Sequence, residues 1–351
     1  MPGRAPGAGN AGKIPEYVLL VPAVGQPLSS RRYYVVRGAD GKHTGKVSAC
    51  SREEDKTACC FCSCVNDAKP RALDRADVYQ QVEVQQLPSA PGRNKGFKAV
   101  AVATDGIPPS YLRNKGWKVS TVPASRDDDL ADDAHGVDSA LRRRMPDLDG
   151  GAEGSSSSSP PVVVVGRWYV PFMFVKADGE YRRLKDQFRK CKFYQMTMEQ
   201  SWEQIYIHTR RHQESSSSEP AEVTVTATVR RATALLGGTG GDAVAVQEGG
   251  PEVEGGAVWF RPAAAAAAAA TVVLDTVVWE RMRWEVERGG WVTAGDGADE
   301  ERIERVERRD GQWRQFGCYL LVERFVLRRM DGSVALTCEF RHTDKIRAKW
   351  V

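Results

Sequence analysis

The sequence contains no apolar run that is long enough to cross a membrane. Its longest uncharged apolar stretch spans residues 263–274 and ends at Asp275, which is short of the roughly 18 residues that a membrane-spanning helix needs. The apolar stretch at residues 17–21 is interrupted by Pro22, and the residues before it are mostly Gly, Pro and Ala. We therefore expect neither a transmembrane segment nor a secretory or transit peptide.

The chain also has little net charge and few histidines. Lys and Arg number 50 against 46 for Asp and Glu, and there are five His among 351 residues. An excess of four positive charges gives no attraction to phosphate or anionic lipid along the whole chain, so any basic site must be local. No G-x-S-x-G nucleophile elbow and no group of acid and base residues stands out. We predict no catalytic or cofactor-binding residues, leave the cofactor open, and expect a non-enzymatic protein.

Acceptor sequences for N-linked glycosylation are absent as well, although eight cysteines are present. Without a secretory signal, this number of cysteines indicates a reducing compartment in which thiols stay free or bind metal. The predicted location is the cytoplasm or the nucleus.

Low-complexity segments divide the chain into modules, because they lack the apolar periodicity that offsets the entropy of ordering. We expect a disordered tail at residues 1–13, a Cys-containing β-rich module at 14–148, a linker at 149–161, and a Trp-rich β module at 162–351 with disordered loops near 215–220 and 237–256.

Alternation of apolar and polar residues predicts mostly antiparallel β-structure. Residues 193–207 place Met196, Met198 and Trp202 on one face and turn Glu199 outward, and residues 319–329 turn at Asp331-Gly332 into a hairpin with 334–342. Residues 278–288 also alternate and are predicted as a strand. Short helices are expected after Pro109 and at residues 137–145 and 181–190. The predicted fold class is α+β, predominantly antiparallel β, with sandwich-like or curved sheets and a few short helices.

Several longer strings carry a family resemblance: QPLSSRRYYV at 26–35, CSREED at 50–55, CCFC at 59–62, DVYQQ at 77–81, WYVPFMF at 168–174, FGCY at 316–319 and RMDGS at 329–333. In these strings the chain resembles a plant family called domain of unknown function 1262. The resemblance implies no activity, cofactor or catalytic residue. Members usually begin with an extra segment, so we expect this chain to be shortened at its N-terminus, and they often have Cys where Val170 stands here.

A cysteine cluster is the candidate metal site, formed by Cys50, Cys59, Cys60, Cys62 and Cys64. Thiolates suit Zn²⁺ or Cu⁺, but the spacing is not the paired C-x2-C of a zinc ribbon. If residues 58–65 form one strand, three of the thiols share a face at separations of roughly 6.6 Å, too far apart for a tetrahedral site without a bulge or a partner strand. Reduced structural thiols are the leading interpretation, and metal binding, palmitoylation and redox pairing are the alternatives.

A basic segment is the candidate nucleic-acid or anionic-lipid site, and its cations are Arg93, Lys95, Lys98, Arg113, Lys115 and Lys118. Phe97, Tyr111 and Trp117 lie between these cations, a combination that suits binding by charge and stacking. The simpler interpretation is a solvated face whose aromatic residues anchor the core.

The function predicted from the sequence is that of a non-enzymatic intracellular interaction protein with a protein partner. A metal-binding or redox-responsive protein that acts through the cysteine cluster is the alternative. A third hypothesis is a membrane-inserting hairpin, because Thr and Val alternate in residues 222–229.

Overall fold

The computed structural model describes residues 16–39, 41–59, 62–88, 96–120, 133–148, 161–177, 183–210, 221–237, 243–246, 250–263, 271–292 and 300–351. They form two compact units. Unit 1 comprises Met1–Pro123 with Arg183–Arg189, and unit 2 comprises Ala124–Arg182 with Lys190–Val351. Residues 133–148, which the sequence analysis assigned to the first module, thus cluster with the second unit.

Unit 1 is built on an antiparallel sheet of four strands in the order β1-β2-β5-β6. Its core contains Val35, Cys50, Val82 and Leu112, because alternate residues of the short Val-rich strands point inward. The elements are β1 (Val18–Pro22), β2 (Arg32–Arg37), a hairpin of β3 (Lys56–Cys59) and β4 (Cys62–Val65), β5 (Gln81–Gln86), β6 (Phe97–Ala101), α1 (Ser110–Arg113), α3 (Leu184–Lys190) and the 3-10 turns Leu28–Ser30, Glu53–Asp55 and Val78–Gln80.

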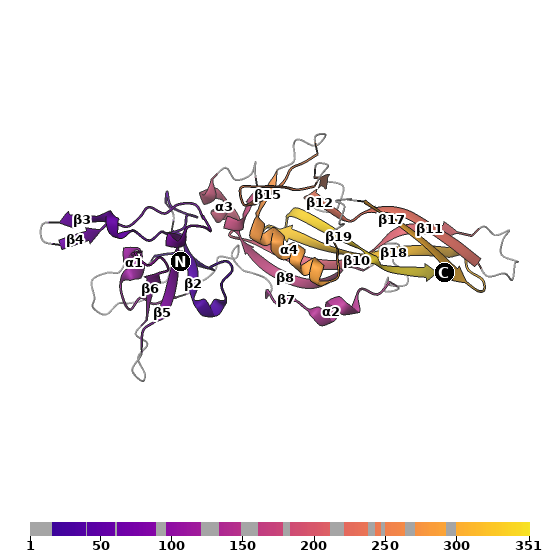
Figure 1. The fold of residues 1–351 in the computed structure, drawn as a ribbon, viewed down its shortest axis with the longest axis horizontal. Coiled ribbons are helices and arrows are strands. Elements are labelled where there is room, and N and C mark those ends of the chain that lie inside the picture. Colours follow the sequence, from indigo (N-terminus) through magenta and orange to yellow (C-terminus); the bar gives the residue numbers. More distant parts are fainter. Residues whose placement is uncertain are drawn as a thin grey trace. The chain divides into compact units, whose positions relative to one another are not determined.

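A sheet of seven strands, each antiparallel to its neighbours, forms the centre of unit 2. Its order is β13 (Val244–Ala245), β12 (Ala232–Leu236), β19 (Val334–Trp350), β18 (Gln315–Arg328), β10 (Phe193–Thr209), β8 (Val163–Pro171) and β7 (Gly136–Val137). The hairpin predicted at Asp331-Gly332 joins β18 and β19, and Gly332 has the positive φ of 85° that this turn requires. Figure 1 shows the long strands β10, β18 and β19 side by side.

The two faces of this sheet have different chemistry. One face is apolar and includes Met198 and its register partner Phe325. The other face carries crossed ion pairs, among them Arg328 with Glu199 and Arg341 with Glu339. The sequence analysis correctly placed Glu199 on the other face of the strand from the methionines. The exposed fraction of Glu199 is nevertheless only 8%, and Arg328 donates a hydrogen bond to its carboxylate.

The helix α4 (Thr276–Arg288) covers the apolar face and replaces the strand predicted at residues 278–288. That prediction was wrong. The buried residues Val278, Met282 and Val286 recur every four positions, which is a helical spacing, and the Asp275 side chain caps the first turn by accepting a hydrogen bond from the amide of Val277 at 2.9 Å. The Trp279 ring lies 6.1 Å from the ring of Phe340 in β19.

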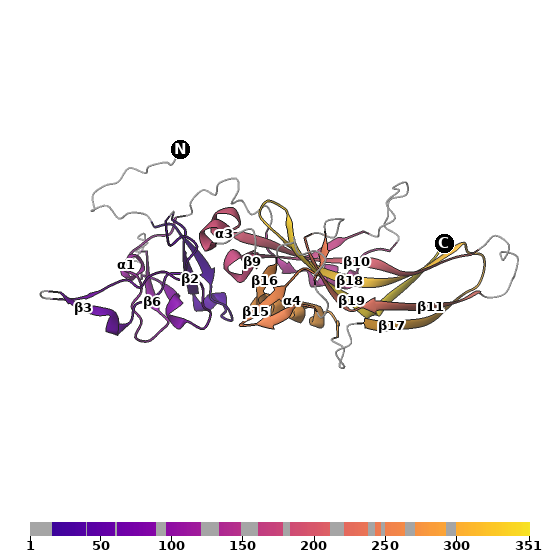
Figure 2. The same ribbon diagram turned by 90° about the horizontal axis from the view of Figure 1, so that it is seen from above.

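Two smaller sheets complete unit 2. One has the order β14 (Glu252–Glu254), β15 (Ala257–Phe260), β16 (Val272–Asp275) and β9 (Val175–Ala177), and its strand β16 runs directly into α4, as Figure 2 shows. The buried 3-10 turn Phe172–Phe174 connects β8 to β9. Part of the loop predicted at 237–256 is therefore ordered, because β13 and β14 pair with neighbouring strands.

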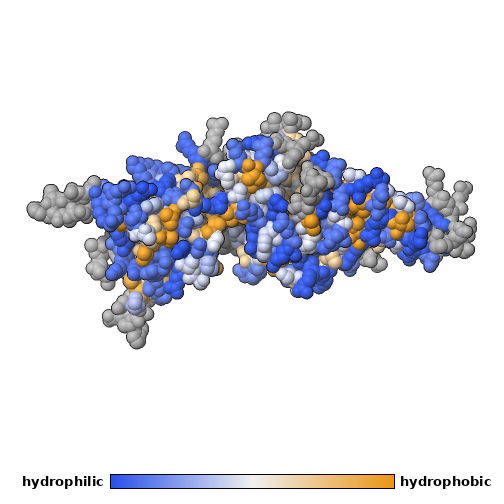
Figure 3. Space-filling model, in the orientation of Figure 1, coloured by the Kyte–Doolittle hydropathy of each residue, from blue (hydrophilic) through white to orange (hydrophobic). Residues whose placement is uncertain are grey.

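The other small sheet pairs β11 (Ala221–Arg230) with β17 (Glu300–Arg309). It packs against β18, where Val223 and Val225 join Phe316 and Cys318 in one cluster of buried residues. On the face drawn in Figure 3, apolar residues form separate patches among hydrophilic ones.

The architecture is mostly antiparallel β with a few short helices, which confirms the predicted fold class. In the part of the chain that the structure describes, no helix is both long and apolar enough to cross a membrane.

We expect the contact between β11–β17 and the central sheet to depend on Phe316, which is fully buried and lies 4.3 Å from the Trp350 ring centroid. Phe316→Ala should lower the free energy of unfolding by about 3–5 kcal/mol, because it leaves a cavity. Val306→Ala is the matched control on β17, where the side chain is 54% exposed, and it should change stability by less than about 0.5 kcal/mol. Urea unfolding measures the stability of both variants. An equal loss of stability in the two would contradict the packing role of Phe316.

Candidate anion-binding site

A cavity of about 330 Å³ lies in unit 2 between the ends of two helices and the central sheet. Its lining comes from three places: α2 (Ser139–Arg144) and the turn after it, the end of α4, and the strands β10, β18 and β19. The lining residues are Ser139, Arg142, Arg143, Met145, Gln200, Arg288, Gly289, Leu321, Glu323 and Lys345.

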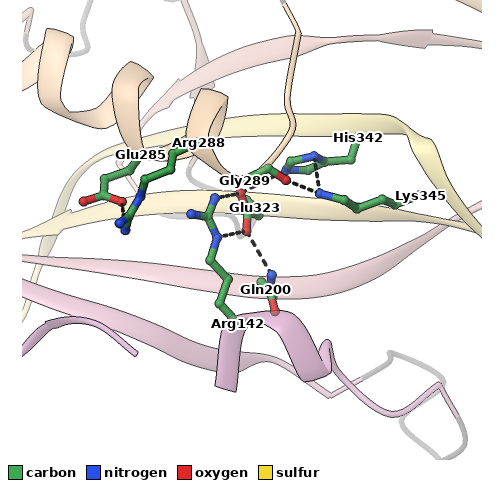
Figure 4. A network of polar contacts seen from close by, with 8 residues as sticks. All are labelled: Arg142, Gln200, Glu285, Arg288, Gly289, Glu323, His342 and Lys345. Atoms are coloured by element: carbon green, nitrogen blue, oxygen red, sulfur yellow. Dashed lines mark hydrogen bonds and ion pairs between the residues drawn. The ribbon is translucent and has the colours of Figure 1, made fainter. Parts of the chain in front are cut away.

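Glu323 is the buried carboxylate at the centre of this site. Its Oε1 accepts hydrogen bonds from Arg142 Nε at 2.7 Å and from Gln200 Nε2 at 2.9 Å, and its Oε2 lies 2.9 Å from His342 Nε2. Figure 4 shows these groups converging from α2, β10 and β19. Burial alone raises the pKa of Glu323, but the hydrogen bonds from His342 and Arg142 outweigh it and lower that pKa to about 2. The carboxylate is therefore charged at neutral pH.

The two ends of helix α2 fix the position from which Arg142 reaches Glu323. The Asp138 side chain caps its first turn by accepting hydrogen bonds from the amides of Ala140 and Leu141 at 3.0 and 2.9 Å. The helix ends at Met145, a non-glycine residue with φ 58° and ψ 158°. This sparsely populated conformation stores strain of about 1–3 kcal/mol, and strain of this kind is concentrated at functional sites.

Gly289, the residue that ends α4, allows the close approach of Arg142. A Cβ atom at this position would overlap the Arg142 guanidinium group, so any larger residue would push the arginine away from Glu323. The Gly289 carbonyl oxygen accepts a hydrogen bond from Lys345 Nζ. Gly289 thus positions two of the cationic side chains that line the cavity.

The hydrogen bonds of His342 define its tautomer. Nε2 faces the Glu323 carboxylate, which can only accept, so Nε2 carries a proton. Nδ1 lies 3.1 Å from Lys345 Nζ. When Lys345 is an ammonium group it has only protons to give, and His342 Nδ1 is then the acceptor.

The cavity lining carries an excess of positive charge. Arg142, Arg143, Arg288 and Lys345 line it against the single carboxylate of Glu323. Glu323 neutralises Arg142. Glu285, which does not line the cavity, accepts a hydrogen bond from Arg288 at 2.8 Å. Among the described residues Arg143 forms no ion pair, and its Nε donates only to the Ser139 carbonyl oxygen at 3.2 Å. The lining is therefore suited to an anion.

Gln200 adds an acceptor that has no partner. Its side-chain oxygen Oε1 is buried and receives no hydrogen bond, while its nitrogen donates to Glu323. The opposite amide orientation would turn this oxygen toward the carboxylate, which is unfavourable because neither group could donate. Gln200 Oε1 is thus an unsatisfied acceptor in the wall of the site, an exception because buried polar atoms are nearly always hydrogen-bonded.

The sequence analysis missed these residues, although a signal was present. In residues 319–329 the alternation places Glu323 on the same face as Leu321 and Phe325. A charged residue on an apolar strand face indicates a buried ion pair. Its partner was not recognisable, because Arg142 is separated from it by 181 residues.

The predicted cysteine metal site is only partly covered by the described residues, and metal binding there stays a prediction. Cys50 is 3% exposed and lies in the core of unit 1 beside Val35 and Leu112. The single strand considered for residues 58–65 is instead the β3–β4 hairpin, in which Cys59 is the register partner of Cys62. Cys60 and the side chains of Cys59, Cys62 and Cys64 lie outside the described residues. Among those that are described, no group of three or more His, Cys, Asp or Glu could hold a metal ion.

The basic segment is only partly described. Arg113, Lys115 and Lys118 are exposed, Lys98 is half-buried, and Arg93 and Lys95 lie outside the described residues. Its aromatic residues are used for packing, since Tyr111 and Trp117 contact the core of unit 1 and Trp117 lies 5.4 Å from the ring of Phe97. This supports the anchoring role of the aromatic residues, and binding of nucleic acid or lipid stays a prediction.

We expect Glu323→Gln to destabilise the protein in a pH-dependent way. The folded-state pKa of about 2 lies below the ordinary glutamate pKa of 4.5, so the carboxylate contributes stability above pH 4.5 that is lost as the pH falls through 2. This contribution is on the order of 3 kcal/mol. Chemical unfolding of wild type and variant should show that difference at pH 7 and a smaller one near pH 3.

Glu304→Gln is the control for this pair of measurements, because the Glu304 side chain is 61% exposed. It should change stability by less than about 0.5 kcal/mol at either pH. If the difference in the free energy of unfolding between wild type and Glu323→Gln stays the same from pH 7 to pH 3, the lowered pKa of Glu323 is refuted.

We expect the described cysteines to be unreactive in the folded protein. Burial raises the pKa of the Cys50 thiol to about 12, and it also raises the pKa of Cys191, Cys318 and Cys338. Because the thiolate is the reactive form, iodoacetamide at pH 8 should modify these four residues only after unfolding in guanidinium. Peptide mass spectrometry measures this, and rapid labelling of native Cys50 would contradict its burial.

Comparison with known proteins finds a family match over a short N-terminal stretch and supports no specific function. Residues 5–61 match the model of a family described as protein of unknown function, DUF1262, and none of the curated proteins matches the chain. A similar solved structure is the crystal structure of Cry35Ab1, with 10% sequence identity over 95% of this chain and 79% of that chain and a TM-score of 0.41. The match over residues 5–61 agrees with the family resemblance that the motifs described above carry.

Proposed function

We propose that this protein is a non-enzymatic binding protein whose unit 2 holds a small organic anion in the cationic cavity. The excess of positive charge in the lining is the observation that carries the proposal, with four cationic side chains against one carboxylate. Arginine groups at the rim of a partly enclosed site recognise carboxylate or phosphate through charge-assisted hydrogen bonds.

The cavity size favours a small ligand. A volume of about 330 Å³ is at the lower end of the roughly 300–1,000 Å³ that is typical of small-molecule sites. A folded partner would need a surface of about 800 Å² on each side. The cavity therefore supports a small-molecule ligand, while the protein partner predicted from the sequence would need a separate surface.

The alternative functions from the sequence receive less support. Cys50 packs in a core with a thiol that is protonated at neutral pH, which counts against a role as a thiolate ligand. In the β11–β17 pair, Val225 is the register partner of Arg305 and Val223 that of Glu307. Directly paired residues of antiparallel strands share a face, so charged side chains would accompany the valines into lipid, which is costly.

We expect inorganic phosphate to bind to the full-length protein with a 1:1 stoichiometry, measured by isothermal titration calorimetry at low ionic strength. The double variant Arg143→Gln, Arg288→Gln should weaken binding at least about tenfold, because each lost charge-assisted hydrogen bond is worth about 1.5–3 kcal/mol. Added salt should weaken wild-type binding because it screens the partly exposed arginines.

Arg302→Gln is the matched control, since Arg302 lies on β17 with a side chain that is 67% exposed. This variant should bind phosphate as the wild type does. Absence of binding at low salt, or an equal loss in the control, would rule out the cavity as the anion site.

A further inference from the structure

We propose that Lys345 is a nucleophilic amine that captures a carbonyl-bearing anion in this cavity as a covalent imine. This inference rests on the proposed function, because the arginines would hold the anionic group of the same ligand. It adds the chemical class of the ligand, a small aldehyde or ketone with a phosphate or carboxylate group.

The surroundings of Lys345 differ from those of an ordinary surface lysine. Its side chain lines the cavity, and Nζ donates to the Gly289 carbonyl oxygen. Among the described residues no carboxylate forms an ion pair with it, since the Oε1 of Glu323 is occupied by Arg142 and Gln200 and the Oε2 by Arg142 and His342. The amine is thus held in place by hydrogen bonds to neutral groups and not by an ion pair with a carboxylate.

His342 provides a base for the Lys345 proton. Its Nδ1 lies 3.1 Å from Nζ and accepts a hydrogen bond from the ammonium form. Transfer of that proton leaves a neutral amine beside an imidazolium group, whose Nε2 still donates to the charged carboxylate of Glu323. A histidine supported by a carboxylate on its far nitrogen is a recurrent arrangement for activating a nucleophile.

The electrostatic surroundings of Lys345 also favour its neutral amine form. Burial lowers the pKa of Lys345, and Arg142 on α2 lowers it further, while Glu323 on β18 and Asp344 on β19 oppose this. The net direction is downward, so the neutral, nucleophilic form is more populated than in a solvated lysine.

The reaction needs no oxidant or cofactor. The Nζ lone pair attacks the carbonyl carbon, a C–N bond forms, and proton transfer gives a carbinolamine. The hydroxyl group leaves as water with a proton from the His342 imidazolium, and the His342 Nδ1, now neutral, accepts the remaining extra proton from the nitrogen. One amine and one carbonyl compound thus become one imine and one water. The step is reversible by hydrolysis, which suits a binding protein that captures and releases its ligand.

The rest of the lining completes the ligand description. Arg143 and Arg288, which line the cavity, supply donors for the anionic group. A ligand with an anionic group and a carbonyl group would contact these two arginines and Lys345.

Reductive trapping tests the proposal on the full-length protein. Pyridoxal 5′-phosphate, a small aldehyde with a phosphate group, is the probe, and sodium borohydride reduces any imine to a stable secondary amine. Peptide mass spectrometry should find Lys345 labelled at least about tenfold more than any other lysine when the probe is substoichiometric. Lys345→Arg should reduce labelling of that peptide to background, whereas Lys349→Arg on the same strand should leave labelling of Lys345 unchanged.

A second probe separates this inference from the proposed function. Pyridoxine 5′-phosphate carries an alcohol in place of the aldehyde and cannot form an imine. If it binds in a calorimeter and yet pyridoxal 5′-phosphate labels Lys345 no more than other lysines, the imine is overturned and the anion site stands. If neither compound nor inorganic phosphate binds, the proposed function fails as well. Circular dichroism and thermal unfolding of Lys345→Arg show whether the loss of labelling reflects loss of the fold.

Discussion

The burial of the Glu323 carboxylate is the constraint on which the rest of unit 2 depends. A carboxylate that is 1% exposed is stable in its charged form only if it is paired and hydrogen-bonded, because removal of an ion from water costs several kcal/mol. Arg142, Gln200 and His342 meet this requirement from three different elements. The same carboxylate thus ties helix α2, strand β10 and strand β19 to strand β18, and loss of any one donor leaves the others around an incompletely compensated charge.

The chemistry of the cavity follows from this pairing. Arg142 is neutralised by Glu323 and packs against Gly289, so it forms the wall of the cavity rather than a free ligand group. The excess charge then falls on Arg143 and Lys345, because Glu285 pairs with Arg288. His342 lies with one nitrogen on Glu323 and the other near Lys345, and it links the structural carboxylate to the amine that faces the cavity. A structural ion pair and a candidate reactive group are therefore parts of one network.

Local patterns predicted much of the fold and little of this network. The alternation along β10 and the Asp331-Gly332 turn between β18 and β19 appear as expected, because strand periodicity and turn chemistry act over a few residues. The prediction of a strand in place of helix α4 was wrong because Met282, Trp284 and Val286 alternate with charged residues, which imitates a strand, although the buried positions recur every four residues. The cysteine motif predicted a site in unit 1, where the structure places Cys50 in the core.

The sequence by itself determined that the protein is rich in antiparallel β-structure, that it has a hairpin near its C-terminal end and that it resembles the DUF1262 family. These properties depend on short periodicities and on contiguous strings of residues. Only the tertiary structure decided that Arg142 meets Glu323 and that Lys345 lies beside His342 at the edge of a cavity. Electrostatic pairing acts through space between side chains that are distant along the chain, and burial in a low-dielectric interior gives that pairing its strength.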